Sequence, residues 1–226
     1  MKTVSIIIPV HNEQNTIAEI IKRVKKANTL KLNKEIIVIN DGSKDNTEII
    51  LKTINGITRL NHEINQGKGS AIRTGLQSAT GDIFIIQDAD LELNPAEYPQ
   101  LLAPILTNET KIVYGSRYLK NKYVNWLSML ANVAVTQTAN ILYGLKITDE
   151  ATGYKVFTRE VLNNITLTCK RFEFCPEFTA KVTKKGYTIK EVSISYNYRQ
   201  PNEGKKVGWK DGFEALWTLI KYKFVE

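Results

Sequence analysis

Short apolar runs that alternate with helix-like segments constrain the fold of this chain more than any other feature. The runs, which indicate buried strands, occupy residues 3–10, 34–40, 57–62, 83–86 and 111–118. Between them, apolar residues recur at helical spacing, and Asn94-Pro95-Ala96-Glu97 is typical of a helix start. Strands and helices that alternate over short connections form a mostly parallel sheet with helices on both faces. We therefore expect an α/β fold.

Polar clusters follow four of these strands. They occupy residues 9–13, 40–43, 87–92 and 116–117. In parallel sheets, ligands bind beyond the carboxyl ends of the strands, so these clusters predict a functional edge. The third cluster places Asp88, Asp90 and Glu92 directly after a buried strand, where hard oxygen ligands can share a divalent cation bound to phosphates. Taken alone, this acidic triplet could equally be a solvated turn.

Two common nucleotide-binding motifs are missing from the chain. The turn after the first strand reads PVHNE, without the glycines of a dinucleotide-binding fingerprint. Gly67-Lys68-Gly69 lacks the spacing of a phosphate-binding P-loop. The remaining possibility at this edge is a nucleotide that is held by carboxylates and by a metal on its phosphates.

Composition narrows the class of partner. A chain of 226 residues has room for one large α/β domain, or for one domain with an appendage. Its net charge of +8 suits a nucleic acid, an anionic membrane surface or a phosphate-rich ligand. No nucleic-acid-binding motif accompanies the charge, so we expect no nucleic-acid partner. The sequence shows no secretory signal, no apolar run long enough to span a membrane and no disulfide pattern, which predicts a cytoplasmic location.

Five motifs in order, PVHNE, NDGSKDNT, NQGKGSAIRTG, QDADLELNP and YGSRY, closely resemble those of family 2 glycosyltransferases of the GT-A fold. Later blocks, including TDEATGYKVF and EGKKVGWKDGFEALW, are similar to its polyprenyl-phosphate sugar transferases, the branch that includes dolichyl-phosphate mannose synthases. The resemblance covers nearly the whole chain. It implies a Rossmann-like, mostly parallel GT-A sheet, with a C-terminal helical and loop extension over the active-site edge.

Within that single domain, residues 1–118 would form the nucleotide-sugar-binding core. Residues 119–226 would form its acceptor-binding and membrane-proximal portion.

The resemblance also implies which residues contact the donor and its cofactor. They are Pro9, His11, Glu13, Asp41, Lys68, Asp88, Ala89, Asp90, Glu92, Arg117, Arg199, Lys205 and Lys206. Asp88, Asp90 and Glu92 would hold Mg²⁺ or Mn²⁺ against the diphosphate, and Asp41 would bond the base or ribose. Asp41 could instead be an ordinary turn residue, and Lys68 could simply open a helix.

Asp90, Arg117 and Asp149 are the candidate catalytic residues. Arg117 belongs to the motif that binds the acceptor phosphate or the donor sugar. An acceptor monophosphate, with a second pKa of about 6, is already ionised at neutral pH and needs no strong base. A hydroxyl acceptor needs one, and Asp149 is the candidate, unless it caps a helix or pairs with a tyrosine. We expect His62 to be an ordinary strand-end residue.

The implied function is metal-dependent, inverting transfer of a hexose from a UDP- or GDP-sugar to a polyprenyl phosphate, dolichyl or undecaprenyl. Two alternatives stay open. One keeps the donor but uses a saccharide hydroxyl as acceptor, and the other is a binding module for nucleotide sugars that has no catalytic activity.

The second half of the chain contains two segments that suit a membrane surface. Residues 125–145 form a mostly apolar helix pattern, interrupted by polar residues that argue against a membrane span. The resembled branch usually carries a basic residue here for the acceptor phosphate, and none occurs between Tyr123 and Gly144. The last helix has an aromatic stripe flanked by lysines, which suits either a bilayer surface or core packing. We expect peripheral association with the cytoplasmic face of the membrane.

Overall fold

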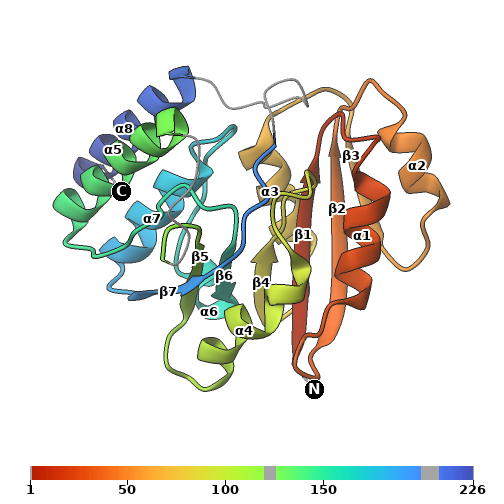
Figure 1. Ribbon diagram of the computed structural model, residues 1–226, viewed down its shortest axis with the longest axis horizontal. Coiled ribbons are helices and arrows are strands. Elements are labelled where there is room, and N and C mark those ends of the chain that lie inside the picture. Colours follow the sequence, from red (N-terminus) through yellow and green to blue (C-terminus); the bar gives the residue numbers. More distant parts are fainter. Residues whose placement is uncertain (1, 120–125, 200–208, 226) are drawn as a thin grey trace.

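The computed structural model describes residues 2–119, 126–199 and 209–225. Within these ranges, seven strands form one sheet in the order β3-β2-β1-β4-β6-β5-β7 (Figure 1). The strands are β1 Thr3–Val10, β2 Asn33–Asp41, β3 Thr58–His62, β4 Ile83–Ile86, β5 Ile112–Ser116, β6 Lys155–Thr158 and β7 Ile189–Ser193. The helices are α1 Ile17–Lys26, α2 Thr47–Thr53, α3 Lys68–Ser78, α4 Tyr98–Leu106, α5 Trp126–Tyr143, α6 Arg159–Asn163, α7 Phe174–Lys184 and α8 Trp209–Phe224, with the 3₁₀ turn η1 Pro95–Glu97 before α4.

The sheet is mostly parallel, as predicted, and β6 is its antiparallel member. It lies between β4 and β5 and runs opposite to both. The sequence pattern did not indicate β6, because the strand is short and begins with a lysine. The fold nevertheless buries Lys155 completely: its Nζ donates to the Glu150 carbonyl at 2.7 Å and lies 3.8 Å from the centre of the Tyr114 ring.

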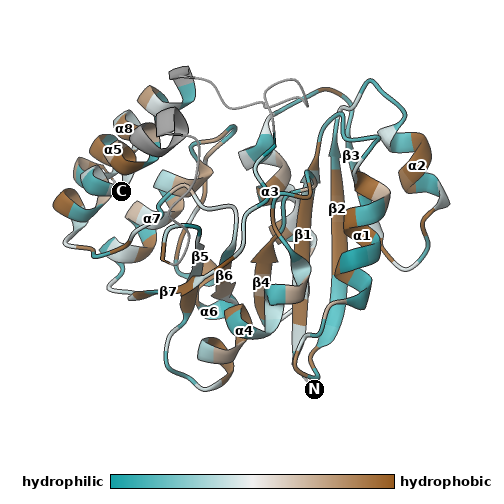
Figure 2. Ribbon diagram, in the orientation of Figure 1, coloured by the Kyte–Doolittle hydropathy of each residue, from teal (hydrophilic) through white to brown (hydrophobic). Residues whose placement is uncertain are grey.

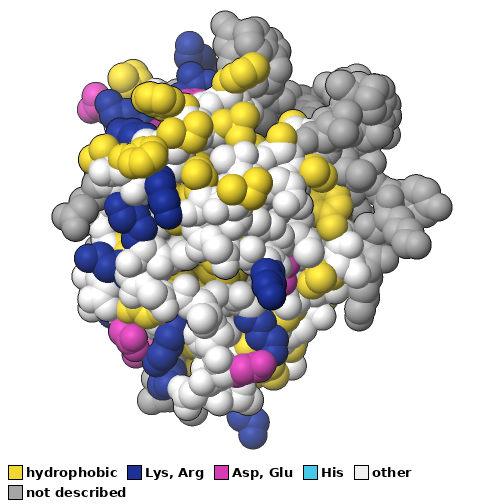
Figure 3. All heavy atoms as spheres, turned by 90° about the vertical axis from the view of Figure 1, so that its left-hand side faces the viewer, with side chains coloured by type: hydrophobic (Ala, Val, Ile, Leu, Met, Phe, Trp, Pro, Cys, Tyr) yellow, Lys and Arg dark blue, Asp and Glu magenta, His cyan; other side chains and the backbone are white. Residues whose placement is uncertain are grey.

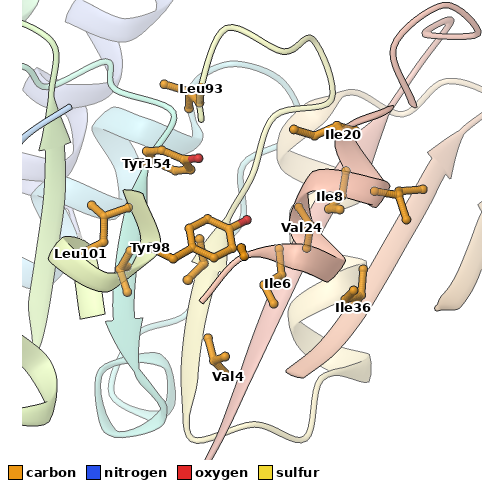
Figure 4. Close-up of a cluster of buried hydrophobic side chains, with 14 of the residues drawn as sticks. Val4, Ile6, Ile8, Ile20, Val24, Ile36, Leu93, Tyr98, Leu101 and Tyr154 are labelled. Atoms are coloured by element: carbon orange, nitrogen blue, oxygen red, sulfur yellow. The ribbon is translucent and has the colours of Figure 1, made fainter. Parts of the chain in front are cut away.

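Two apolar cores lie on opposite faces of the sheet because successive strand residues point to opposite sides. Val4, Ile6 and Ile8 of β1 pack against α1 and α4 (Figure 4). Ile7, between them in sequence, packs with α3, and the same second core continues along β5 and β6 to α7. In Figure 2, β1 and β4 are accordingly brown along most of their length, whereas α1 carries both teal and brown residues.

The C-terminal helix α8 packs against α5 rather than against the sheet. Val135 and Ala139 of α5 meet Leu219 of α8 in a small third cluster, and the Tyr143 hydroxyl donates to the Leu219 carbonyl at 2.7 Å. Figure 1 shows the pair stacked beyond α7, at the upper left of the molecule. Within the described ranges, no helix is both long and apolar enough to cross a membrane.

Candidate active site

The carboxyl ends of the parallel strands point toward the top of Figure 1. Residues at these strand ends line a cavity of about 1160 Å³. Side chains from the ends of β1, β2, β4 and β5 line it, together with residues of α3, α5, α7 and α8. The predicted site residues among them are Pro9, His11, Glu13, Asp41, Lys68, Asp88, Ala89, Asp90, Glu92, Arg117 and Arg199. Asp149 is buried against Arg117, and Lys205 and Lys206 lie outside the described residues.

Asp41, at the end of β2, anchors the loop that leads into α3. Its Oδ1 accepts from the Gln66 backbone N–H at 2.9 Å, and its Oδ2 accepts from the Gly67 N–H at 2.8 Å. The imidazole Nδ1 of His62 lies 2.7 Å from the same Oδ1, and its Nε2 lies 2.9 Å from the Thr74 hydroxyl. His62 is the last residue of β3, as expected, and its ring also contacts Asp41 and Thr74, a supporting contact that the sequence did not indicate.

Glu13 and Arg199 form a bidentate ion pair across the cavity. The guanidinium donates to Oε1 and Oε2 of Glu13 at 2.9 and 2.8 Å. The hydrogen bonds from Arg199 to Glu13 outweigh burial and raise the pKa of Arg199. His11 lies beside this pair, with its Nδ1 2.8 Å from the Asp41 carbonyl oxygen. The end of β1 is thus joined both to β2 and to the segment that follows β7.

The acidic strand end carries more negative charge than its surroundings neutralise. Lys68 places its Nζ 2.5 Å from Oδ1 of Asp88. Burial lowers the pKa of Lys68, but Asp88, together with Cys175 and Asp90, outweighs burial and raises it. Burial, with the nearby carboxylates of Asp88 and Glu92, raises the pKa of Asp90 to about 7. A cation bound at Asp88 and Asp90 would relieve this repulsion.

Buried neighbours surround Asp88 and hold its backbone in place. Gln87 has no exposed surface; its Oε1 accepts from the Tyr98 and Tyr154 hydroxyls, and its Nε2 donates to the Asp88 carbonyl at 3.0 Å. A Cβ on Gly153 would lie 2.4 Å from Oδ2 of Asp88, so a larger residue there would displace that carboxylate from its present position. Leu91 adopts a φ of 66°, the kind of backbone strain that clusters at functional sites.

Two of the three predicted metal ligands fit a divalent cation. Mg²⁺ and similar ions bind through one or two carboxylates plus substrate phosphates and water, which Asp88 and Asp90 can provide for. Glu92 fits less well, because its Oε2 accepts from the Tyr196 hydroxyl at 2.6 Å and its Oε1 from the Arg199 backbone N–H at 3.0 Å. Among the residues that the structure describes, no group of three or more His, Cys, Asp or Glu side chains is placed to hold a metal.

Arg117 and Asp149 form a second bidentate pair, deeper than the first. The guanidinium donates from Nε to Oδ2 and from Nη2 to Oδ1, both at 2.7 Å, and the Arg117 backbone N–H also donates to Oδ2. Burial lowers the pKa of Arg117, but the Asp149 carboxylate more than offsets this and raises it. With both oxygens accepting from a guanidinium, Asp149 is better placed to position Arg117 than to take a proton. This geometry argues against the role of general base that the sequence suggested.

Residues 5–166 match the protein-family model described as glycosyl transferase family 2. The chain belongs to glycosyltransferase family 2. It is 28% identical to the UDP-N-acetylglucosamine–dolichyl-phosphate N-acetylglucosaminyltransferase of Methanococcus voltae, over 98% of this chain and 96% of that protein. It is 32% identical to the dolichol-phosphate mannosyltransferase of Pyrococcus furiosus, over 97% of this chain but 64% of that protein.

The fold of this glycosyltransferase matches a solved GT-A structure, which confirms the predicted architecture. The glucosyl-3-phosphoglycerate synthase from Mycobacterium tuberculosis, solved with Mn²⁺ and UDP-glucose, superposes with a TM-score of 0.78. The match covers 100% of this chain and 80% of that one at 21% identity. The likeness at this identity concerns the fold alone.

The sequence of this glycosyltransferase did not indicate the residues that support Asp41 and Asp88, chiefly Gln87, His62 and Gly153. Gln87 and His62 act through hydrogen bonds that join separate elements of the fold. Gly153 acts through the space that it leaves for Asp88. The position of Gln87 directly before Asp88, at the end of a buried strand, was the available signal for a positioning role. His62 and Gly153 carried no comparable signal.

Proposed function

We propose that this glycosyltransferase moves one hexose from a nucleoside diphosphate sugar to a polyprenyl phosphate, with inversion at the anomeric carbon. The observation that carries the proposal is the extent of the cavity. Its lining runs from the polar strand ends, with Asp88 and Asp90, to Ala131 and Val135 of α5 and Leu216 of α8. A charged donor end and an apolar acceptor end in one cavity suit a reaction between a nucleotide sugar and a lipid phosphate.

In this proposal, different side chains of the cavity bind the metal, the donor and the acceptor. A divalent cation at Asp88 and Asp90 supplies neutralisation of the leaving diphosphate when bound. Arg199 closes over the same diphosphate, and the fixed guanidinium of Arg117 binds the acceptor phosphate in the sugar's vicinity. The acceptor oxygen attacks already ionised, so no side chain needs to remove a proton.

Exposed apolar side chains on α5 and α8 support a membrane surface as the source of the acceptor. Ile141 of α5 and Trp217, Ile220 and Phe224 of α8 are all exposed, and Phe224 is 81% exposed. Figure 3 shows hydrophobic side chains gathered on the upper half of the face that carries these helices, with lysine and arginine side chains beside them. Aromatic residues flanked by cations suit the interface of an anionic bilayer.

The names of the relatives point the same way. The proteins of Methanococcus voltae and Pyrococcus furiosus are named for transfer to dolichyl or dolichol phosphate. A saccharide hydroxyl is the second candidate acceptor. It is favoured by the sequence of α5, WLSMLANVAVTQTANILY, which holds no lysine or arginine for a lipid phosphate.

The test is transfer of labelled sugar from UDP- and GDP-linked glucose, N-acetylglucosamine and mannose to a short polyprenyl phosphate. We expect an organic-extractable product with Mn²⁺ or Mg²⁺ that disappears with a chelator and in Asp90→Ala. Lys26→Gln, which changes an exposed lysine at the end of α1 outside the cavity lining, is the control and should retain activity. A protein that binds donor but forms no lipid product with any of these donors would move the proposal to a saccharide acceptor.

A further inference from the structure

Lys68 occupies a position that the proposed metal needs. Its Nζ lies 2.5 Å from Oδ1 of Asp88. Asp88 is also one of the two carboxylates proposed to bind the metal. The lysine and the aspartate are 25% and 19% exposed, and both line the cavity. The pair therefore faces the space where a diphosphate and its cation would bind.

The backbone around Lys68 is held firmly on both sides. Gly67 adopts a φ of 96°, and its N–H donates to Asp41. The Gly69 and Ser70 N–H groups donate to the carbonyls of Arg171 and Lys170 at 2.9 Å. A Cβ on Gly69 would lie 2.8 Å from the Arg171 carbonyl oxygen, so glycine is needed for this approach. The start of α3 is thus a fixed base from which a long, flexible side chain reaches Asp88.

An ammonium group and a metal ion that both bind the Asp88 carboxylate would repel each other at close range. A divalent cation would lie roughly 2.1 Å from a ligating carboxylate oxygen. With the ammonium 2.5 Å from that oxygen, two like charges would stand a few ångströms apart in a partly buried site. The charge of Lys68 therefore opposes metal binding at Asp88 for as long as the ammonium stays there.

We propose that Lys68 is a tethered counter-ion that competes with the divalent cation for Asp88. When donor and metal enter together, the ammonium leaves Asp88 for the diphosphate oxygens in the same cavity. When the metal enters alone, no anion receives the ammonium, so Lys68 weakens binding of the metal by itself. The inference rests on the proposed function only in taking Asp88 as a metal ligand.

The test is the affinity for Mn²⁺ without nucleotide, measured by the electron paramagnetic resonance signal of free Mn²⁺. We expect Lys68→Gln to bind Mn²⁺ about tenfold more tightly than the wild type, the effect of removing a partly exposed competing charge. Lys68→Arg keeps a cation in place and should bind as weakly as the wild type. Lys26→Gln makes the same change in net charge away from the cavity lining and should also match the wild type.

A second measurement guards against a change in folding. Because Asp88 loses its counter-ion in Lys68→Gln, Mn²⁺ should raise the melting temperature of this variant more than that of the wild type. Equal or weaker Mn²⁺ binding by a folded Lys68→Gln variant would overturn the proposal. Neither readout involves sugar transfer, so a wrong acceptor in the proposed function would leave this result unaffected.

Discussion

The Arg117–Asp149 pair gives the sharpest prediction about the site. Asp149 has no exposed surface and Arg117 has 14%, so Asp149→Asn would leave a mostly buried guanidinium without its counter-charge. An asparagine keeps one oxygen acceptor but turns an NH₂ group toward a guanidinium that can only donate. Removing one partner of a buried pair costs about 3–5 kcal/mol, and we expect about 3 kcal/mol here because one acceptor remains.

Urea unfolding of the wild type, Asp149→Asn, Arg117→Met and the double variant measures this cost. Without Arg117, the Asp149 charge has lost its main partner, so the added Asp149→Asn change should cost less than about 1 kcal/mol. The two changes are therefore expected to be non-additive by about 2 kcal/mol. A single Asp149→Asn variant that loses under 1 kcal/mol would refute the interpretation of a tightly held buried pair.

The pH dependence of transfer separates positioning from general base catalysis. If Asp149 positions Arg117, Asp149→Asn lowers kcat/KM by about 100-fold at every pH, and the shape of the profile is kept. If Asp149 is the base, the fall in rate at acid pH disappears in the variant, because the group that titrates is gone. Loss of that acid limb would restore the role that the sequence suggested.

Three further predictions concern other parts of the molecule. Burial raises the pKa of Glu177, but hydrogen bonds from its neighbours outweigh this effect and lower the pKa from 4.5 to about 2. The ionised Glu177 therefore stabilises the folded protein fully above pH 4.5, and this stabilisation is lost as the pH falls toward 2. Urea unfolding should show the wild type losing about 3 kcal/mol more than Glu177→Gln over that window, and parallel curves would contradict it. If Arg199 contacts the donor diphosphate as proposed, Arg199→Met should weaken donor binding about tenfold in titration calorimetry. Unchanged affinity would place Arg199 in a purely structural pair with Glu13. Trp217→Ser with Phe224→Ser should reduce co-sedimentation with anionic vesicles at least tenfold, whereas equal binding would show that α8 does not contact the bilayer.

The fold was predictable where the sequence of one segment is enough to show that the segment is a buried strand. Residues 3–10 and 83–86 were predicted as strands with the bounds observed for β1 and β4, because an uninterrupted apolar run can be buried on both faces. The antiparallel strand β6 was not predictable in this way. Its Lys155 is acceptable in the core only because the Glu150 carbonyl and the Tyr114 ring are brought to it by the rest of the fold.

The same distinction applies to the site. Strand ends located Asp41 and Asp88 at one edge, since the carboxyl ends of parallel strands meet there. The sequence could not show what each carboxylate contacts. His62 lies 21 residues from Asp41 and Arg117 lies 32 from Asp149, and these pairings depend on the order of strands in the sheet. The position of these residues at one edge of the sheet was therefore predictable, whereas the pairing that decides between base, ligand and anchor was not.

The three ion pairs of the site differ in how easily their side chains can exchange partners when a ligand binds. Asp149 with Arg117, Glu13 with Arg199 and Asp88 with Lys68 form a series of increasing exposure to solvent. Attraction between opposite charges strengthens as water is excluded, so the first pair is the hardest to open and the last the easiest. An incoming diphosphate and its cation offer new partners of opposite sign to Lys68, Arg199 and Asp88, but they cannot reach the buried carboxylate of Asp149. Ligand binding should thus exchange the outer pairs and leave Arg117 in place, as a fixed cation against which the acceptor phosphate can be oriented.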